Sequence, residues 1–237
     1  MLNTTIVPEI VAGNSAKKFA PATRIQHSLV ATTEQRVLIG LAQRTPAWIN
    51  SDHLTLLGLI SQCLVGVCYA LSRLNPDMLV AGIVFLTLNW LGDSLDGTLA
   101  RVRNRQRPRY GFYVDHVVDT IAAAFLMGGL ALSGYVHPVI ALAMLAGFLM
   151  LSIEAYLTTY TLGQFQLSYW KFGPTEIRIL LAIGNIALLR HPAIKILNRK
   201  VLLFDLGGLI ATAGMILFLV LSAIQHTKQL YEQERLS

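Results

Sequence analysis

The sequence predicts an all-α fold: a polytopic membrane bundle of six transmembrane helices with an N-terminal amphipathic surface helix. Two observations lead to this prediction. Of the 237 residues, 54% are hydrophobic and only 14% are charged, whereas soluble domains carry about 25% charged residues. In addition, six long apolar segments follow one another, and most approach the ~20 residues that a helix needs to cross a membrane.

The six apolar segments span residues 53–74, 78–102, 112–134, 137–162, 174–189 and 202–224. At about 1.5 Å per residue, helices of these lengths cross all or most of a ~30 Å hydrocarbon core. The fifth segment is the shortest, and it carries Glu176 and Arg178 near its start.

Residues 23–43 precede the first span and repeat apolar side chains at helical spacing, with Arg24 and Arg36 among them. This pattern predicts an amphipathic helix, which either lies on the membrane surface or packs on the protein's own face. We therefore divide the chain into an N-terminal segment (1–50), a six-helix transmembrane domain (51–226) and a cytosolic tail (227–237).

The net charge of +6 indicates an acidic membrane surface as partner rather than nucleic acid. The basic residues cluster beside the apolar segments, and no separate polar domain exists to hold a nucleic-acid site. Counting Lys and Arg in the loops gives 13 on one side of the membrane and 5 on the other. Both termini and the active site are therefore expected to face the cytosol, although the basic stretch 190–200 argues against this.

Acidic side chains occur inside the predicted spans, where each is costly and therefore a functional candidate. They are Asp93, Asp96, Asp115, Asp119, Glu154, Glu176 and Asp205. Spacings of three and four residues place the first pair on one helix face and the second pair on another. If the two helices are antiparallel neighbours, the four carboxylates meet, and they require positive charge. Oxygen ligands favour Mg²⁺ or Mn²⁺.

Small residues and an arginine accompany the aspartates. Gly97, Ala100 and Gly111 leave room for a ligand, and Arg101 offers a fixed cation for a phosphate oxygen. Together with a metal, this set describes a pyrophosphate site. The alternative is that the small residues only permit tight helix packing in the membrane.

These residues resemble a known signature. It reads Asp93-x-x-Asp96-Gly97-x-x-Ala100-Arg101, then nine residues, then Gly111-x-x-x-Asp115-x-x-x-Asp119. The chain resembles the CDP-alcohol phosphotransferase family, whose six spans and N-terminal surface helix also match. The resemblance implies that Asp93, Asp96 and Asp115 hold the divalent metal on the CDP pyrophosphate. It implies that Asp119 is the general base, a residue that in the family can also face a second metal. Family members are commonly dimeric, so the resemblance also implies a homodimer.

The resemblance also implies substrate-binding residues: Gly97, Ala100, Arg101 and Gly111 within the signature, and Asp52 and Thr55 upstream of it. Two positions depart from the family pattern. Asp52 stands where many members have Asn, and Pro108 stands where members often carry a Ser or Thr that bonds phosphate.

Two further matches resemble the choline and ethanolamine phosphotransferase branch. His116 directly follows the third aspartate, and Glu176 belongs to Gly-Pro-Thr-Glu at the start of the fifth span. In that branch such residues are catalytic. Alternatively, His116 hydrogen-bonds within the bundle and Glu176 favours a helix N-terminus.

The expected activity is attack of an alcohol oxygen on the phosphorus of a CDP-linked donor, with release of CMP. The substrates would be CDP-diacylglycerol with a polar alcohol, or a CDP-amino alcohol with diacylglycerol; His116 and Glu176 favour the second pair. A divalent-cation transporter that uses the same carboxylates is the alternative.

Overall fold

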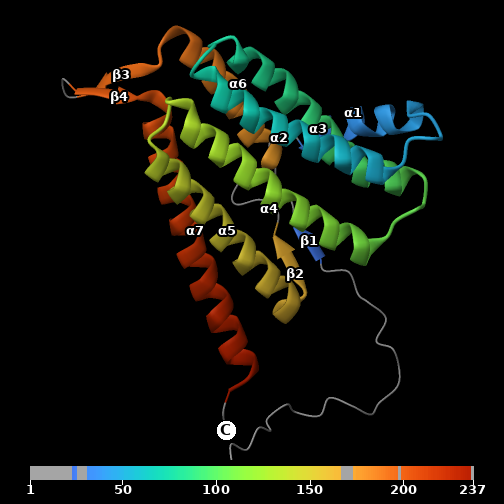
Figure 1. Ribbon diagram of the computed structural model, residues 1–237. Coiled ribbons are helices and arrows are strands. Elements are labelled where there is room, and N and C mark those ends of the chain that lie inside the picture. The colour runs from blue at the N-terminus through green and yellow to red at the C-terminus, as the bar shows by residue number, and fades with distance from the viewer. Residues whose placement is uncertain (1–22, 26–30, 167–172, 197–198, 236–237) are drawn as a thin grey trace, which may run out of the picture.

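The computed structural model describes residues 23–25, 31–166, 173–196 and 199–235, and these are mainly helical (Figure 1). The helices are α1 (Ala31–Arg44), α2 (Ser51–Ser72), α3 (Met78–Val102), α4 (Pro108–Ser133), α5 (Pro138–Leu162), α6 (Pro174–Arg190) and α7 (Leu203–Gln233). Strand β1 (Thr23–Ile25) pairs in parallel with β2 (Gln164–Gln166). Strands β3 (Ala193–Ile196) and β4 (Arg199–Leu202) form an antiparallel hairpin.

The all-α polytopic bundle is confirmed. Within the described ranges, five helices are long and apolar enough to cross a membrane, namely α2, α3, α4, α5 and α7. The fifth predicted span is α6, which has 17 residues and a length of about 26 Å. Pro174 is tolerated at its first turn, and the Glu176 carboxylate accepts a hydrogen bond from the Gly173 N–H at 2.9 Å. The chain is an integral membrane protein.

The N-terminal helix differs from its prediction. It begins at Ala31, whereas residues 23–25 form β1, and residues 26–30 lie outside the described part. A helical reading of residues 23–25 was therefore wrong, because their backbone pairs with β2, which is distant in sequence. In α1, Leu38 is buried in a cluster with Leu54 and Leu99, while Val37 is exposed. The helix thus packs on the protein's own face, and contact with the membrane surface stays a prediction.

Helix α2 lies against both α3 and α4 at points where glycines let the backbones touch. A Cβ atom on Gly92 of α3 would lie 2.5 Å from the Gly58 nitrogen of α2. A Cβ atom on Gly129 of α4 would lie 2.0 Å from the Gly66 carbonyl oxygen of α2. Such distances exclude any side chain at these positions, so small residues set the separation of the three helices.

A buried polar contact attaches α6 to this three-helix core. The Tyr69 hydroxyl of α2 donates to Asn185 Oδ1 at 2.7 Å, and the Asn185 amide donates to the Leu79 carbonyl of α3 at 3.3 Å. Both polar side chains are almost fully buried, beside apolar residues such as Val65 and Leu188. Because unmet hydrogen bonds are costly in apolar surroundings, these partners specify where α6 sits.

Helices α5 and α7 lie side by side (Figure 1). Polar contacts join them. Near the start of both helices, the His137 N–H donates to Asp205 Oδ1 at 2.6 Å. About two turns before both helices end, Glu154 Oε1 lies 2.5 Å from His226 Nδ1. Asp205 and Glu154, two of the acidic residues in predicted spans, therefore connect α5 with α7. They do not lie with the four aspartates of the signature. Between these contacts, Gly208 allows α7 to approach the side chains of α5 closely.

Two features of the C-terminal third were not predicted. The basic stretch after α6 includes the β3–β4 hairpin (Figure 1). In this hairpin Lys195 pairs with Lys200. Helix α7 continues to Gln233, past the predicted span end at 224 and into the predicted tail; residues 236–237 lie outside the described part.

The glycine contact between α2 and α4 predicts a position-specific effect. Gly129→Ala should lower the free energy of unfolding by about 1–3 kcal/mol or more, because the new methyl group collides with backbone. Gly128→Ala is the matched control, since a Cβ there has nothing within 4 Å. Thermal unfolding of the purified protein in detergent measures both. Equal stability of the two variants would contradict the packing described here.

Candidate active site

The four aspartates of the signature line one small cavity, which we call the aspartate cavity. Asp93 and Asp96 come from α3, Asp115 and Asp119 come from α4, and Thr55 comes from α2. The cavity measures ≈ 10 Å³, about the space that one water-sized particle needs. The structure thus brings together residues that the sequence placed on two separate helix faces.

The helix packing explains why these side chains meet. Asp93 directly follows Gly92, whose backbone touches α2 at Gly58. Gly58 itself lines the aspartate cavity, as does Ala122 of α4. Small residues therefore bring the backbones close and leave the remaining space to the carboxylates.

Asp96 is held by donors from α2 and from its own helix. The Thr55 hydroxyl donates to Asp96 Oδ2 at 2.6 Å, and the Gly97 N–H donates to Asp96 Oδ1 at 2.5 Å. One turn earlier in α2, the Ser51 hydroxyl donates to the Asp96 carbonyl oxygen at 3.0 Å. Both oxygens of this carboxylate are therefore fixed in direction.

Asp93 is held by residues that the sequence analysis did not assign to the site. Arg178 of α6 places Nη2 2.6 Å from Asp93 Oδ2 and donates through Nε to Asn89 Oδ1 at 2.7 Å. Asn89 also donates to the Gly58 carbonyl at 2.9 Å. Signals for both existed in the sequence: Arg178 is charged within an apolar segment, and Asn89 lies one helical turn before Asp93.

The donor chemistry of the aspartate cavity suits a divalent cation. Its charged ligands are all carboxylate oxygens, which Mg²⁺ and Mn²⁺ prefer, and one guanidinium cannot balance four carboxylates. Among the residues that the structure describes, no three His, Cys, Asp or Glu side chains converge closely enough to hold an ion. In this arrangement Asp93 bonds to Arg178 and Asp96 bonds to Thr55.

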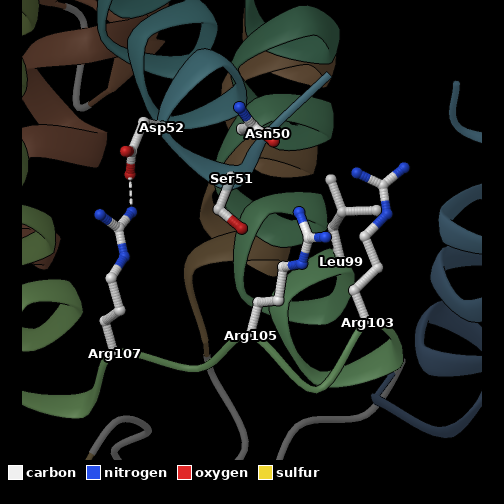
Figure 2. Close-up of a pocket in the computed structure, with 7 residues that line it drawn as sticks. All are labelled: Asn50, Ser51, Asp52, Leu99, Arg103, Arg105 and Arg107. Carbon is white, nitrogen blue, oxygen red and sulfur yellow. Dashed lines mark hydrogen bonds and ion pairs between the residues drawn. The ribbon is translucent and has the colours of Figure 1, made fainter. Parts of the chain in front are cut away.

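A second, larger cavity lies where α2 begins and the α3–α4 loop passes, and we call it the arginine cavity (Figure 2). It measures ≈ 250 Å³. Its lining consists of Asn50, Ser51, Asp52, Leu99, Arg103, Arg105 and Arg107. Ser51 lines this cavity and bonds to Asp96. Thr55, one turn further along α2, lines the aspartate cavity, so about one helical turn separates the two cavities.

The three arginines have different surroundings. Arg103 donates to backbone carbonyls before α2, including Ile49 O at 2.5 Å. Arg107 forms an ion pair with Asp52, which ties the α3–α4 loop to the first turn of α2. The guanidinium of Arg105 lies beside Ser51 in Figure 2. The cavity therefore presents positive charge, a feature suited to anions.

The other signature residues lie outside both cavity linings. Arg101 donates to the Thr98 hydroxyl at 3.0 Å, and its guanidinium lies beside Gly97 on the same helix. Ala100 is half-buried, and the Cα of Gly111 faces open space at the start of α4. Their predicted roles in substrate binding stay predictions.

His116 and Glu176 also lie outside the two cavity linings. His116 Nδ1 lies 2.5 Å from the Phe112 carbonyl oxygen, and its ring packs edge-on against Tyr156 of α5. Glu176 is buried and bonds to the Gly173 N–H at the start of α6. These contacts match the structural alternatives for the two residues, whose catalytic roles stay predictions.

The contact between Thr55 and Asp96 predicts that the protein loses stability when the Thr55 hydroxyl is removed. Thr55→Val should lower the free energy of unfolding by about 1–3 kcal/mol, because the half-buried Asp96 Oδ2 loses its donor. Thr87→Val is the control, since that exposed hydroxyl bonds only within its own helix, to Ile83. Thermal unfolding in detergent compares the two variants. A smaller loss for Thr55→Val than for Thr87→Val would contradict the assigned contact.

Comparison with models of known protein families identifies the family of this chain. The sequence model of one family, described as CDP-alcohol phosphatidyltransferase, matches residues 48–225. This range covers most of the chain and includes both cavities. A search of curated protein sequences found no match.

Proposed function

The chain belongs to the CDP-alcohol phosphatidyltransferase family, and from that premise we propose the reaction that its two cavities perform. As a family member it is a membrane transferase of substituted phosphate groups in phospholipid synthesis. We propose that it moves a phosphoalcohol or phosphatidyl group from a CDP-linked donor to a hydroxyl acceptor and releases CMP. The observation that carries this proposal is the carboxylate-lined cavity about one turn of α2 from an arginine-lined cavity.

The arginine cavity supports binding of the CDP part of the donor. At ≈ 250 Å³ it is far larger than the aspartate cavity, and Arg105 offers a guanidinium to phosphate oxygens. Because Ser51 lies between the two cavities, a diphosphate placed there would extend toward the aspartates. The reacting phosphorus would then lie near Asp119, at the membrane-embedded end.

The aspartates would divide the remaining work. Asp93, Asp96, Asp115 and Asp119 are the residues available to hold Mg²⁺ or Mn²⁺, which supplies charge neutralisation for the pyrophosphate when bound. Asp119 takes the proton of the acceptor hydroxyl. The acceptor oxygen forms a bond to phosphorus while the bond from phosphorus to the CMP oxygen breaks, and CMP leaves with that electron pair.

The base assignment predicts that Asp119→Asn reduces CMP release by about 10²–10⁴-fold, because an amide cannot accept the hydroxyl proton. Asp77→Asn is the control. Asp77 is exposed and directly precedes α3, whereas the cavity aspartates of α3 lie towards the other end of that helix. Purified variants in detergent would be assayed for CMP by chromatography, with thermal unfolding as a check of folding. Full activity of Asp119→Asn would exclude this role.

A divalent-cation transporter is the second candidate, and the ion-sized, carboxylate-lined cavity favours it. Protein in liposomes separates the two functions. We expect Mg²⁺-dependent CMP formation from CDP-linked donors without accumulation of metal inside the liposomes. Metal uptake without CMP formation would support the transporter instead.

The substrate pair follows from the resemblance of His116 and Glu176 to the choline and ethanolamine branch. This resemblance supports a CDP-amino alcohol as donor and diacylglycerol as acceptor. A panel of CDP donors and alcohols, read by lipid mass spectrometry, tests the pair. Product formed only from CDP-diacylglycerol would exclude it.

The distribution of positive charge supports a cytosolic position for both termini and the active site. The α3–α4 loop, which carries Arg103, Arg105 and Arg107, lies at the end where α2 begins, and positive residues favour the cytosol. The basic β3–β4 hairpin lies at the opposite end and opposes this orientation. The orientation is tested by fusing the C-terminus to a reporter enzyme that is active only on one side of the membrane.

A further inference from the structure

Arg178 is a charged side chain in α6 whose contacts are to the wall of the aspartate cavity. Its guanidinium donates through Nη2 to Asp93 at 2.6 Å and through Nε to Asn89 at 2.7 Å. Only 16% of the side chain is exposed. Among the described residues, its buried Nη1 atom is without a hydrogen-bond partner. The side chain is therefore held on two sides but keeps a donor unused.

The position of this guanidinium is fixed from α2 as well as from α3. Asn89, which accepts from Arg178 Nε, donates its own amide to the Gly58 carbonyl at 2.9 Å. Gly58 in turn lies against the backbone of Gly92. A chain of direct contacts therefore connects the positive charge to the helix packing that forms the cavity.

The charge itself is permanent, because an arginine in a protein does not lose its proton. Burying such a charge in a membrane bundle is costly unless it is paired. The pairing partner is Asp93, one of the four carboxylates of the aspartate cavity. A residue that served only to attach α6 to the bundle could do so as Asn185 does, without charge.

We propose that Arg178 is a positioning residue: a built-in counter-ion that holds Asp93 at the cavity wall and competes with a divalent cation for its carboxylate. The inference rests on the proposed function only in taking the aspartate cavity to bind such a cation. A positive charge beside a cation site repels the cation, so Arg178 weakens metal binding and keeps it reversible.

This counter-ion role and a purely structural role predict opposite results. If Arg178 only supports the bundle, its replacement disorders the carboxylates and weakens metal binding. If Arg178 is the counter-ion, a neutral side chain of similar length removes the competitor, and the cation binds more tightly. Arg178→Gln makes this replacement, and Arg178→Lys keeps the charge.

The test measures Mn²⁺ binding directly, with no donor or acceptor present. Full-length protein in lipid nanodiscs is titrated with Mn²⁺, and the free ion is followed by electron paramagnetic resonance. We expect Arg178→Gln to lower the Kd about tenfold or more, and Arg178→Lys to stay within about threefold of the wild type. Arg190→Gln is the control, because Arg190 is exposed and lies 12 residues further along α6, about 18 Å away.

An unchanged or higher Kd for a folded Arg178→Gln variant would overturn the proposal. If that variant does not fold, a Kd for Arg178→Lys that departs more than about tenfold from the wild type would overturn it. Absence of Mn²⁺ binding to the wild type would overturn the inference together with the metal assignment. The expected shift without CMP release from any donor would sustain the inference and exclude the proposed function.

Discussion

Direct backbone contact between α2 and its two neighbours is the constraint on which the rest of the structure depends. Gly58 meets Gly92 of α3, and Gly66 meets Gly129 of α4. Inside a membrane, lipid competes for apolar surfaces, so close approach through small residues replaces the hydrophobic effect as the source of specific packing. With both contacts made, the acidic faces of α3 and α4 are directed toward the same short stretch of α2, and the aspartate cavity follows.

That cavity concentrates negative charge where the surroundings solvate it poorly. Directional contacts offset part of this cost. A hydroxyl from α2 and a guanidinium from α6 each hold one carboxylate of α3. These donors fix the directions of Asp96 and Asp93, and the guanidinium also adds positive charge near the acidic residues of α4. The site is therefore partly organised by the fold, through contacts from α2 and α6 to the carboxylates of α3.

The acidic site was largely predictable from sequence, because carboxylates in apolar segments are costly and their spacing put each pair on one helix face. The partner glycines were not predictable, since the chain has 18 glycines and only the folded backbone shows which ones meet. Arg178 was visible as a charge in a span, yet its contact with Asp93 joins residues 85 positions apart. Strand β1 was not predicted either, because its partner, strand β2, is also distant in the sequence.

The separation of 85 residues between Asp93 and Arg178 also has a consequence for biosynthesis. A ribosome adds about 5–20 residues per second, so α6 follows α3 into the membrane after about 4–17 seconds. During that interval the carboxylates of α3, and then those of α4, are without the guanidinium that later accompanies them. The acidic helices are thus synthesised before the arginine that pairs with Asp93, and only the folded bundle contains the complete ion pair.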